Sequence, residues 1–296
     1  MSITSRLAAG AAVTLVAVGA LAAAAPATAA PVAAPAAART AAHGSGLAAG
    51  LTDAVGRLTG GQQRLFPHGP AGPGHRLPAA AGATSGAQSS YNWAGYAKQG
   101  TFSSASATWT VPTTLSSHAG YASTWVGLDG YSDSYLTQTG IEEDVVNGRV
   151  TYGAWWEVIT PTNVAPEVAF SGFTVKPGDS ITGTVTRNGS QTTLKLVDNT
   201  TGKSASHTAA FAGPGASAEW IQEDVDVNGY ISTAPDWQKV SFSGVKTNGA
   251  SAGLTSSQSI DIVDTHGTRE TSTSAPTSGS AFTVTWLASG TKTRAE

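Results

Sequence analysis

Two short segments of this 296-residue chain carry the polar side chains best suited to chemistry. Residues 136–140 (Leu-Thr-Gln-Thr-Gly) contain Gln138, and residues 218–225 (Ala-Glu-Trp-Ile-Gln-Glu-Asp-Val) contain Glu223. A carboxylate can take a proton from water, and a carboxamide on a facing strand can donate a hydrogen bond to the oxyanion that the attacking water creates. Such a pair can hydrolyse a peptide bond without a serine, a cysteine or a metal ion.

The alternation of side chains along the strands that must hold these residues adds to this interpretation. In an extended strand, successive side chains point to opposite faces, so Glu219, Ile221 and Glu223 share one face. By the same alternation, Trp155 and Glu157 project together from another strand. Because Glu223 lies between apolar residues on its own face, its carboxylate is expected to be partly removed from water, which suits it to proton transfer.

Taken alone, both residues also fit ordinary structural roles. Exposed or ion-paired carboxylates are common, and a buried glutamine usually satisfies backbone groups. Three segments that contain tryptophan change the balance, since their tryptophans lie beside glycine and acidic residues, as in the wall of a groove for an extended ligand. They are residues 91–96 (Tyr-Asn-Trp-Ala-Gly-Tyr), 123–130 (Ser-Thr-Trp-Val-Gly-Leu-Asp-Gly) and 153–157 (Gly-Ala-Trp-Trp-Glu).

The last two hundred residues predict an all-β domain. Runs rich in Thr, Val, Ser and aromatic residues alternate with turn signals, and helical periodicity is almost absent. Asn-Gly dipeptides, which favour two-residue hairpin turns, occur at 147–148, 188–189, 228–229 and 248–249. Many short antiparallel strands at regular spacing indicate a β-sandwich or jelly roll.

The first part of the chain has a different character. Residues 1–30 contain Arg6, an apolar Ala/Val/Leu stretch and small residues that resemble a cleavage site, so we expect a signal peptide and a secreted, extracellular protein. Residues 31–88 are rich in Ala, Gly and Pro, with four arginines against the single acid Asp53. Residues 89–296 have 11 Lys/Arg against 18 Asp/Glu, a net charge of −7. A cationic leader before an anionic domain is typical of a propeptide that binds electrostatically and is later removed.

The composition also excludes some chemistries. The chain has no cysteine, which rules out a thiol nucleophile, thiolate metal ligands and disulfides. His118, His207 and His266 are scattered without metal-ligand spacing. We therefore expect no metal and no cofactor.

The order of these segments resembles the glutamic peptidases, or eqolisins. The matching motifs are Asn92-Trp93-x-Gly95, Trp125 to Gly130, Gln138-Thr139-Gly140, Trp155-Trp156-Glu157 and Glu219-Trp220-Ile221-x-Glu223, spread over about residues 91–286. The resemblance implies a jelly-roll-like sandwich of two curved antiparallel sheets, with an extended polypeptide substrate lying across the concave face.

The resemblance also implies roles for particular residues. Gln138 and Glu223 match the catalytic pair, while Trp125, Asp129, Trp155 and Glu157 match positions that line or support the cleft. Trp93 is similar to the aromatic residue near the mature N-terminus of the family. The segment between Gln138 and Trp155, which includes residues 142–144 (Glu-Glu-Asp), is slightly longer than in the fungal pattern, and we expect an acidic loop there that bears on substrate preference.

These inferences predict a secreted monomer that hydrolyses peptide bonds in acid, with its own propeptide as a partner. No nucleic acid partner is expected, and no membrane after the signal is removed. The alternative is a carbohydrate-active β-sandwich. In a glycoside hydrolase, Glu157 and Glu223 could be the carboxylate pair, whereas a binding module would need no catalytic residues.

Overall fold

The computed structural model describes residues 76–77, 88–227 and 230–291, all of which belong to one compact unit, Arg57–Glu296. The predicted signal peptide and most of the predicted leader lie outside the described residues. The described part consists of β-strands with one short 3-10 helix, η2 (Ser256–Gln258). The prediction of an all-β fold is confirmed.

The larger sheet, which we call sheet A, has ten strands in the order β1-β2-β18-β3-β13-β5-β6-β7-β8, with β9 also paired to β7. Its strands are antiparallel except for the parallel pair β2–β18. The bounds are β1 (Arg76–Leu77), β2 (Gln88–Ser90), β3 (Trp93–Gln99), β5 (Ala122–Leu128), β6 (Leu136–Val146), β7 (Arg149–Thr160), β8 (Asn163–Val164), β9 (Val168–Ala169), β13 (Ser217–Asp224) and β18 (Ser259–Ile262).

The second sheet, sheet B, has eight strands in the order β12-β11-β10-β4-β16-β20-β19, with β17 paired to β16. The bounds are β4 (Ser104–Thr110), β10 (Ser180–Asn188), β11 (Gln191–Asp198), β12 (Ser204–Ala209), β16 (Lys239–Thr247), β17 (Ala250–Ser251), β19 (Thr271–Thr273) and β20 (Phe282–Trp286). A separate pair is formed by β14 (Asp226–Val227) and β15 (Tyr230–Ile231).

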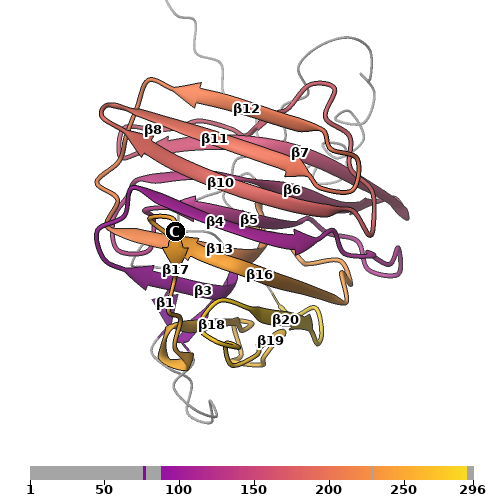
Figure 1. Cartoon of the computed structure of the whole chain (residues 1–296). Coiled ribbons are helices and arrows are strands. Elements are labelled where there is room, and N and C mark those ends of the chain that lie inside the picture. The colour runs from indigo at the N-terminus through magenta and orange to yellow at the C-terminus, as the bar shows by residue number, and fades with distance from the viewer. Residues whose placement is uncertain (1–75, 78–87, 228–229, 292–296) are drawn as a thin grey trace, which may run out of the picture. The chain divides into compact units, whose positions relative to one another are not determined.

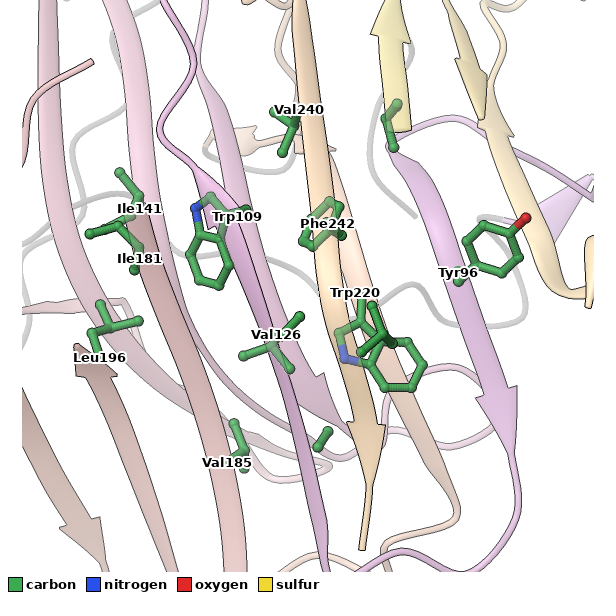
Figure 2. Packing of buried hydrophobic residues seen from close by; sticks show 14 of the residues in the cluster. Tyr96, Trp109, Val126, Ile141, Ile181, Val185, Leu196, Trp220, Val240 and Phe242 are labelled. Carbon is green, nitrogen blue, oxygen red and sulfur yellow. The ribbon is translucent and has the colours of Figure 1, made fainter. Parts of the chain in front are cut away.

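The two large sheets form two layers, with β12, β11, β10, β4 and β16 of sheet B in front of β7, β6, β5, β13 and β3 of sheet A (Figure 1). The main core fills the space between them. Trp109, Phe242 and Ile181 of sheet B pack there with Val126 and Trp220 of sheet A (Figure 2). Because this core takes large apolar side chains from both sheets, the layers cannot separate without exposing them to water.

The two sheets differ in how they are buried. Strands of sheet B alternate between buried and more exposed positions, as in β4 and β10, so that one face meets the core and the other faces solvent. By contrast, every residue of β5 and β13 in sheet A is buried. Sheet A therefore has an outer face, directed away from the main core, that is also buried.

The Asn-Gly turn predictions can be compared with the structure at three positions. Asn147-Gly148 and Asn248-Gly249 have positive φ at both residues and connect β6 to β7 and β16 to β17, as a type I′ turn requires. Asn188 instead ends β10 and pairs with Gln191, so the turn lies at 189–190. Residues 228–229 lie outside the described residues.

Residues 142–144 do not form the predicted loop. They lie inside β6 and pair with residues 151–153 of β7, and the turn comes only at 147–148. The alternation of the strand explains the difference, because it buries Glu143 on the inner face and turns Glu142 and Asp144 to the outer face. The predicted boundary between leader and mature domain, after residue 88, falls within β2.

Candidate active site

The outer face of sheet A carries three successive rows of residues in register across β3, β13, β5, β6 and β7. The first row contains Ala97, Glu219, Gly127, Gln138 and Glu157. The second row contains Gly95, Ile221, Trp125, Gly140 and Trp155. The third row contains Trp93, Glu223, Ser123, Glu142 and Gly153. All seven site residues predicted from the sequence except Asp129 lie in these rows.

Glu223 is held in the third row by two side-chain donors. Asn92 Nδ2 lies 3.1 Å from Oε1, and the indole Nε1 of Trp125 lies 2.7 Å from Oε2. The carboxylate is completely buried. A buried carboxylate needs such donors, because burial without hydrogen bonds would strongly disfavour its charge.

Gln138 is held in the first row by Glu157. Its Nε2 donates a hydrogen bond of 2.7 Å to Glu157 Oε2, across the directly paired strands β6 and β7. The Oε1 atom of Gln138 is buried and has no hydrogen-bond partner among the residues that the structure describes. The amide is thus fixed through one N–H, while its oxygen and its second N–H make no hydrogen bond in the described part of the chain.

Trp125 occupies the middle row, between Gln138 and Glu223. Its ring has room because Gly127 and Gly140 lack a side chain: a Cβ on Gly127 would lie 2.9 Å from Trp125 Cζ3, and one on Gly140 would lie 2.5 Å from Trp125 Cβ. Trp93 packs edge-on against this ring, with the centroids 4.9 Å apart. The glycines of the Trp-Val-Gly and Gln-Thr-Gly motifs therefore leave the space that the Trp125 side chain occupies.

The predicted catalytic pair shares a face, but it does not lie on facing strands as expected from the sequence. β5 separates β6 from β13, and the two residues are offset by four positions along the strands. The carboxylate directly across Gly127 from Gln138 is Glu219, which is also buried. The sequence placed Glu219 on this face but gave it no role.

Asp129 lies apart from the three rows, directly after β5. Its Oδ1 accepts a 2.6 Å hydrogen bond from the backbone N–H of Ala216. Burial raises the pKa of Asp129, although hydrogen bonds from the backbone amides of Gly215 and Ala216 act against the rise. These contacts are with the loop before β13, which suits a supporting role better than substrate contact.

Two further polar residues contact the predicted site residues, although the sequence offered no reason to assign them a role. Ser123 accepts a hydrogen bond of 3.1 Å from Trp155 Nε1 and donates one of 3.0 Å to the Ile141 carbonyl, so it fixes the indole of Trp155. Asn92 is the second, since it contacts Glu223 directly. Its motif was visible in the sequence, but only the fold brings it to a residue 131 positions away.

Neither a metal site nor a membrane span is found in the described ranges. No group of three or more His, Asp or Glu side chains there is arranged to hold a metal ion. In the same ranges, no helix has the length and apolar character needed to cross a membrane.

The comparisons with known proteins identify the family of this chain. The model of the peptidase A4 family matches residues 91–286, which include all three rows. The chain belongs to this family. As a peptidase A4 member it carries the glutamic peptidase motifs noted in the sequence, and the carbohydrate-active alternative is not favoured.

Individual relatives of this peptidase A4 member include scytalidopepsin B of Scytalidium lignicola, which is 33% identical over 144 residues. The alignment covers 46% of this chain and 52% of the relative, about half of its length.

Two solved structures share the fold. The crystal structure of scytalido-glutamic peptidase with a transition state analog inhibitor is 27% identical with a TM-score of 0.55, and it matches over 67% of this chain and 98% of that chain. The eqolisin SCP-B in complex with the tripeptide Ala-Ile-His is 25% identical over the same shares, with a TM-score of 0.51.

Proposed function

We propose that this chain is a secreted acid endopeptidase, in which Glu223 is the general base and Gln138 stabilises the oxyanion. The observation that carries the proposal is the placement of both residues on the buried outer face of sheet A, each fixed by its own polar partner, in a member of the peptidase A4 family. Neither role requires a metal or a cofactor.

In the proposed reaction, ionised Glu223 takes a proton from a water molecule as that water attacks the carbonyl carbon of the scissile peptide. The second N–H of Gln138 donates a hydrogen bond to the resulting oxyanion, since Glu157 holds only one of its two N–H groups. Protonated Glu223 then gives its proton to the leaving amine. Because the base must be ionised in acid, donors to both of its oxygens suit the role.

The middle row indicates where the substrate lies. With Glu223 on one side of Trp125 and Gln138 on the other, the scissile peptide would lie over the Trp125 indole. An extended chain suits this place, because Trp93, Trp125 and Trp155 lie together on the same face of sheet A. The crystallised relatives, which hold a transition state analog and a tripeptide, support a polypeptide substrate.

The opposite charges of the two parts of the chain support synthesis as a precursor. Residues 31–88 carry four arginines against the single acid Asp53, whereas residues 89–296 have a net charge of −7. Removal of this basic leader is the activating step that we propose. Lowering the pH protonates acids of the mature domain while the leader arginines stay charged, which weakens their attraction and triggers self-cleavage.

The test is cleavage of a denatured protein between pH 2 and 8 by the enzyme obtained from the full-length chain. We expect peptide products, no reducing sugars and a maximum at acidic pH. Glu223→Gln and Gln138→Ala should each reduce turnover at least a hundredfold, since one oxyanion donor alone contributes about 10²–10³ to kcat. Gln191→Ala, which changes an exposed glutamine on β11 of sheet B, is the matched control and should retain full activity.

Glu219 provides a second check, because it lies directly across Gly127 from Gln138. The proposal expects Glu219→Gln to retain measurable turnover with an acidic optimum. If Glu219→Gln is inactive and Glu223→Gln is active, the base is Glu219. Maximal activity near neutral pH would overturn the acid mechanism as a whole.

A further inference from the structure

Asn92 occupies the short link between β2 and β3 and reaches the carboxylate of Glu223. We propose that Asn92 is a positioning residue for Glu223 and that Ser90 sets the orientation of its amide. This inference rests on the proposed role of Glu223 as the base. It adds a residue that acts through Glu223 and is not itself assigned contact with the substrate.

The hydrogen bonds around Ser90 determine which end of the Asn92 amide meets Glu223. Ser90 Oγ accepts hydrogen bonds from the backbone N–H groups of Asn92, at 3.3 Å, and Trp93, at 3.1 Å. Its single hydroxyl hydrogen is directed to Asn92 Oδ1, 3.1 Å away. Because Oδ1 is the acceptor of this bond, the Nδ2 end faces Glu223 Oε1 and donates to it.

The rest of the fold holds this unit in place. Ser90 is the last residue of β2, pairs with Ile262 of β18, and accepts a backbone hydrogen bond of 2.9 Å from Val263. The carbonyl of Asn92 accepts a 2.9 Å bond from the N–H of Asp224, the residue after Glu223. Asn92 is thus attached at its backbone to the strand of the base and at its side chain to the base itself.

The arrangement gives each oxygen of Glu223 a different donor. Asn92 serves Oε1, and Trp125 serves Oε2. Both side chains can only donate through the atoms concerned, so both favour an ionised carboxylate, which is the form that accepts a proton from water. Two donors from different segments, the β2–β3 link and β5, also fix the plane of the carboxylate.

A purely structural role for Asn92 predicts different behaviour. Asparagine is common in turns, where its side chain replaces backbone contacts, and its loss would then lower stability while the folded enzyme worked normally. A positioning role instead changes kcat and its pH dependence at a fixed folded fraction. KM should change little, since Asn92 is not placed against the substrate.

The experiment measures kcat and KM from pH 2 to 7 for enzyme obtained from the full-length chain, corrected for the folded fraction. Asn92→Ala should lower kcat about tenfold to a hundredfold, as expected for one hydrogen bond to a charged group, and move the acidic limb of the profile to higher pH. Asn92→Asp should keep activity at the acidic end, where its carboxyl is protonated and can donate. It should lose activity as the pH rises, since two carboxylates then face each other.

Ser90→Ala should also lower kcat, but by less than Asn92→Ala does. In this variant the Asn92 amide is still present beside Glu223, but nothing fixes which of its ends faces the carboxylate. Asn199→Ala is the matched control, as this amide bonds Thr182 on sheet B at 2.9 Å, and it should leave kcat and the profile unchanged. The inference is wrong if Asn92→Ala and Asn92→Asp both keep the parent profile per folded molecule. If Glu223→Gln is active, the proposed function fails first, so the two failures are distinguishable.

Discussion

Thr124 Oγ1 lies 2.7 Å from Glu143 Oε1 within the core between the sheets, and 2.6 Å from Gln222 Oε1. A third contact of 3.3 Å joins Gln222 Nε2 to Glu143 Oε2. Three hydrogen bonds need three hydrogens, but Thr124 has one to give and the Gln222 amide can supply only one of the three contacts in either orientation. The network is complete only when Glu143 is protonated.

This network predicts a fold that weakens as the pH rises. Burial raises the pKa of Glu143 well above its usual range, and the nearby charge of Glu142 adds to the rise, whereas hydrogen bonds from Thr124 and Gln222 oppose it. The pKa of Glu143 is therefore higher in the folded state than in the unfolded state. Its stabilising contribution is complete below the unfolded-state pKa and is lost as the pH rises toward the folded-state pKa. The free energy of unfolding should fall by about 1.4 kcal/mol per pH unit in that window.

Glu143→Gln should remove this dependence, because a glutamine imitates the protonated acid. The variant should match the parent at pH 4 and exceed it at pH 7 in urea unfolding. A parent and variant with parallel stability curves would show that Glu143 is not protonated in the fold.

Asp264 should show the opposite sign. Burial acts to raise its pKa, but hydrogen bonds from the backbone amides of Thr268, at 2.7 Å, and His266, at 2.9 Å, outweigh burial and lower it. Its contribution is therefore present above the unfolded pKa and is lost as the pH falls through the folded one. Asp264→Asn should be less stable than the parent at pH 7, and the difference should shrink toward pH 2. Thermal unfolding across this range measures it, and a constant difference would contradict the prediction.

The hydrogen bond from Trp125 to Glu223 can be removed while an aromatic ring is kept. Trp125→Phe loses the indole donor, so kcat/KM should drop about tenfold to a hundredfold. Trp109→Phe is the matched control, since Trp109 is equally buried but its Nε1 has no hydrogen-bond partner in the described part of the chain. Both variants lose packing, and only the first should lose activity per folded molecule. Equal kinetic effects would show that Trp125 acts through packing alone.

The sequence was sufficient for the all-β fold class and for the side-chain faces of two central strands, β7 and β13. Strand alternation correctly placed Trp155 beside Glu157, and Ile221 between Glu219 and Glu223. The prediction of a loop at residues 142–144 was wrong. Three acids in a row resemble a loop, but here they belong to β6, where Glu143 is buried on the inner face of sheet A and Glu142 and Asp144 on the outer face. The sequence also did not show that β5 lies between β6 and β13, because strand order depends on pairing between residues far apart in the chain.

Gly140 tests the packing that holds the middle row. A Cβ at this position would collide with the Thr124 carbonyl and with Trp125, whose Cβ would be 2.5 Å away. Gly140→Ala should therefore cost about 1–3 kcal/mol of stability and reduce activity by displacing Trp125. Gly148→Asn is the control: Gly148 has φ +73° and open space around it, and asparagine tolerates this backbone. If Gly140→Ala melts like the parent and keeps its kcat, the indole does not need this space.

The pairing of β2 predicts where the mature chain begins. Gln88 accepts a hydrogen bond from the Tyr131 hydroxyl, and β2 pairs with β18 through to Ser90, which orients Asn92. Removal of the leader must therefore leave β2 in place, so we expect an active enzyme whose N-terminus lies at or before Gln88. Intact mass and N-terminal sequencing of the enzyme after acid incubation measure this directly.

A sharper form of the experiment inserts a site for a specific protease into the full-length chain, either within residues 80–86 or between Ser90 and Tyr91. Cutting at the first position should release an active enzyme. Cutting at the second separates Ser90 from Asn92 and should lower kcat more than the Ser90→Ala substitution does, because the strand that fixes the amide is lost as well. A fully active product that begins at Tyr91 would show that β2 has no part in holding Glu223.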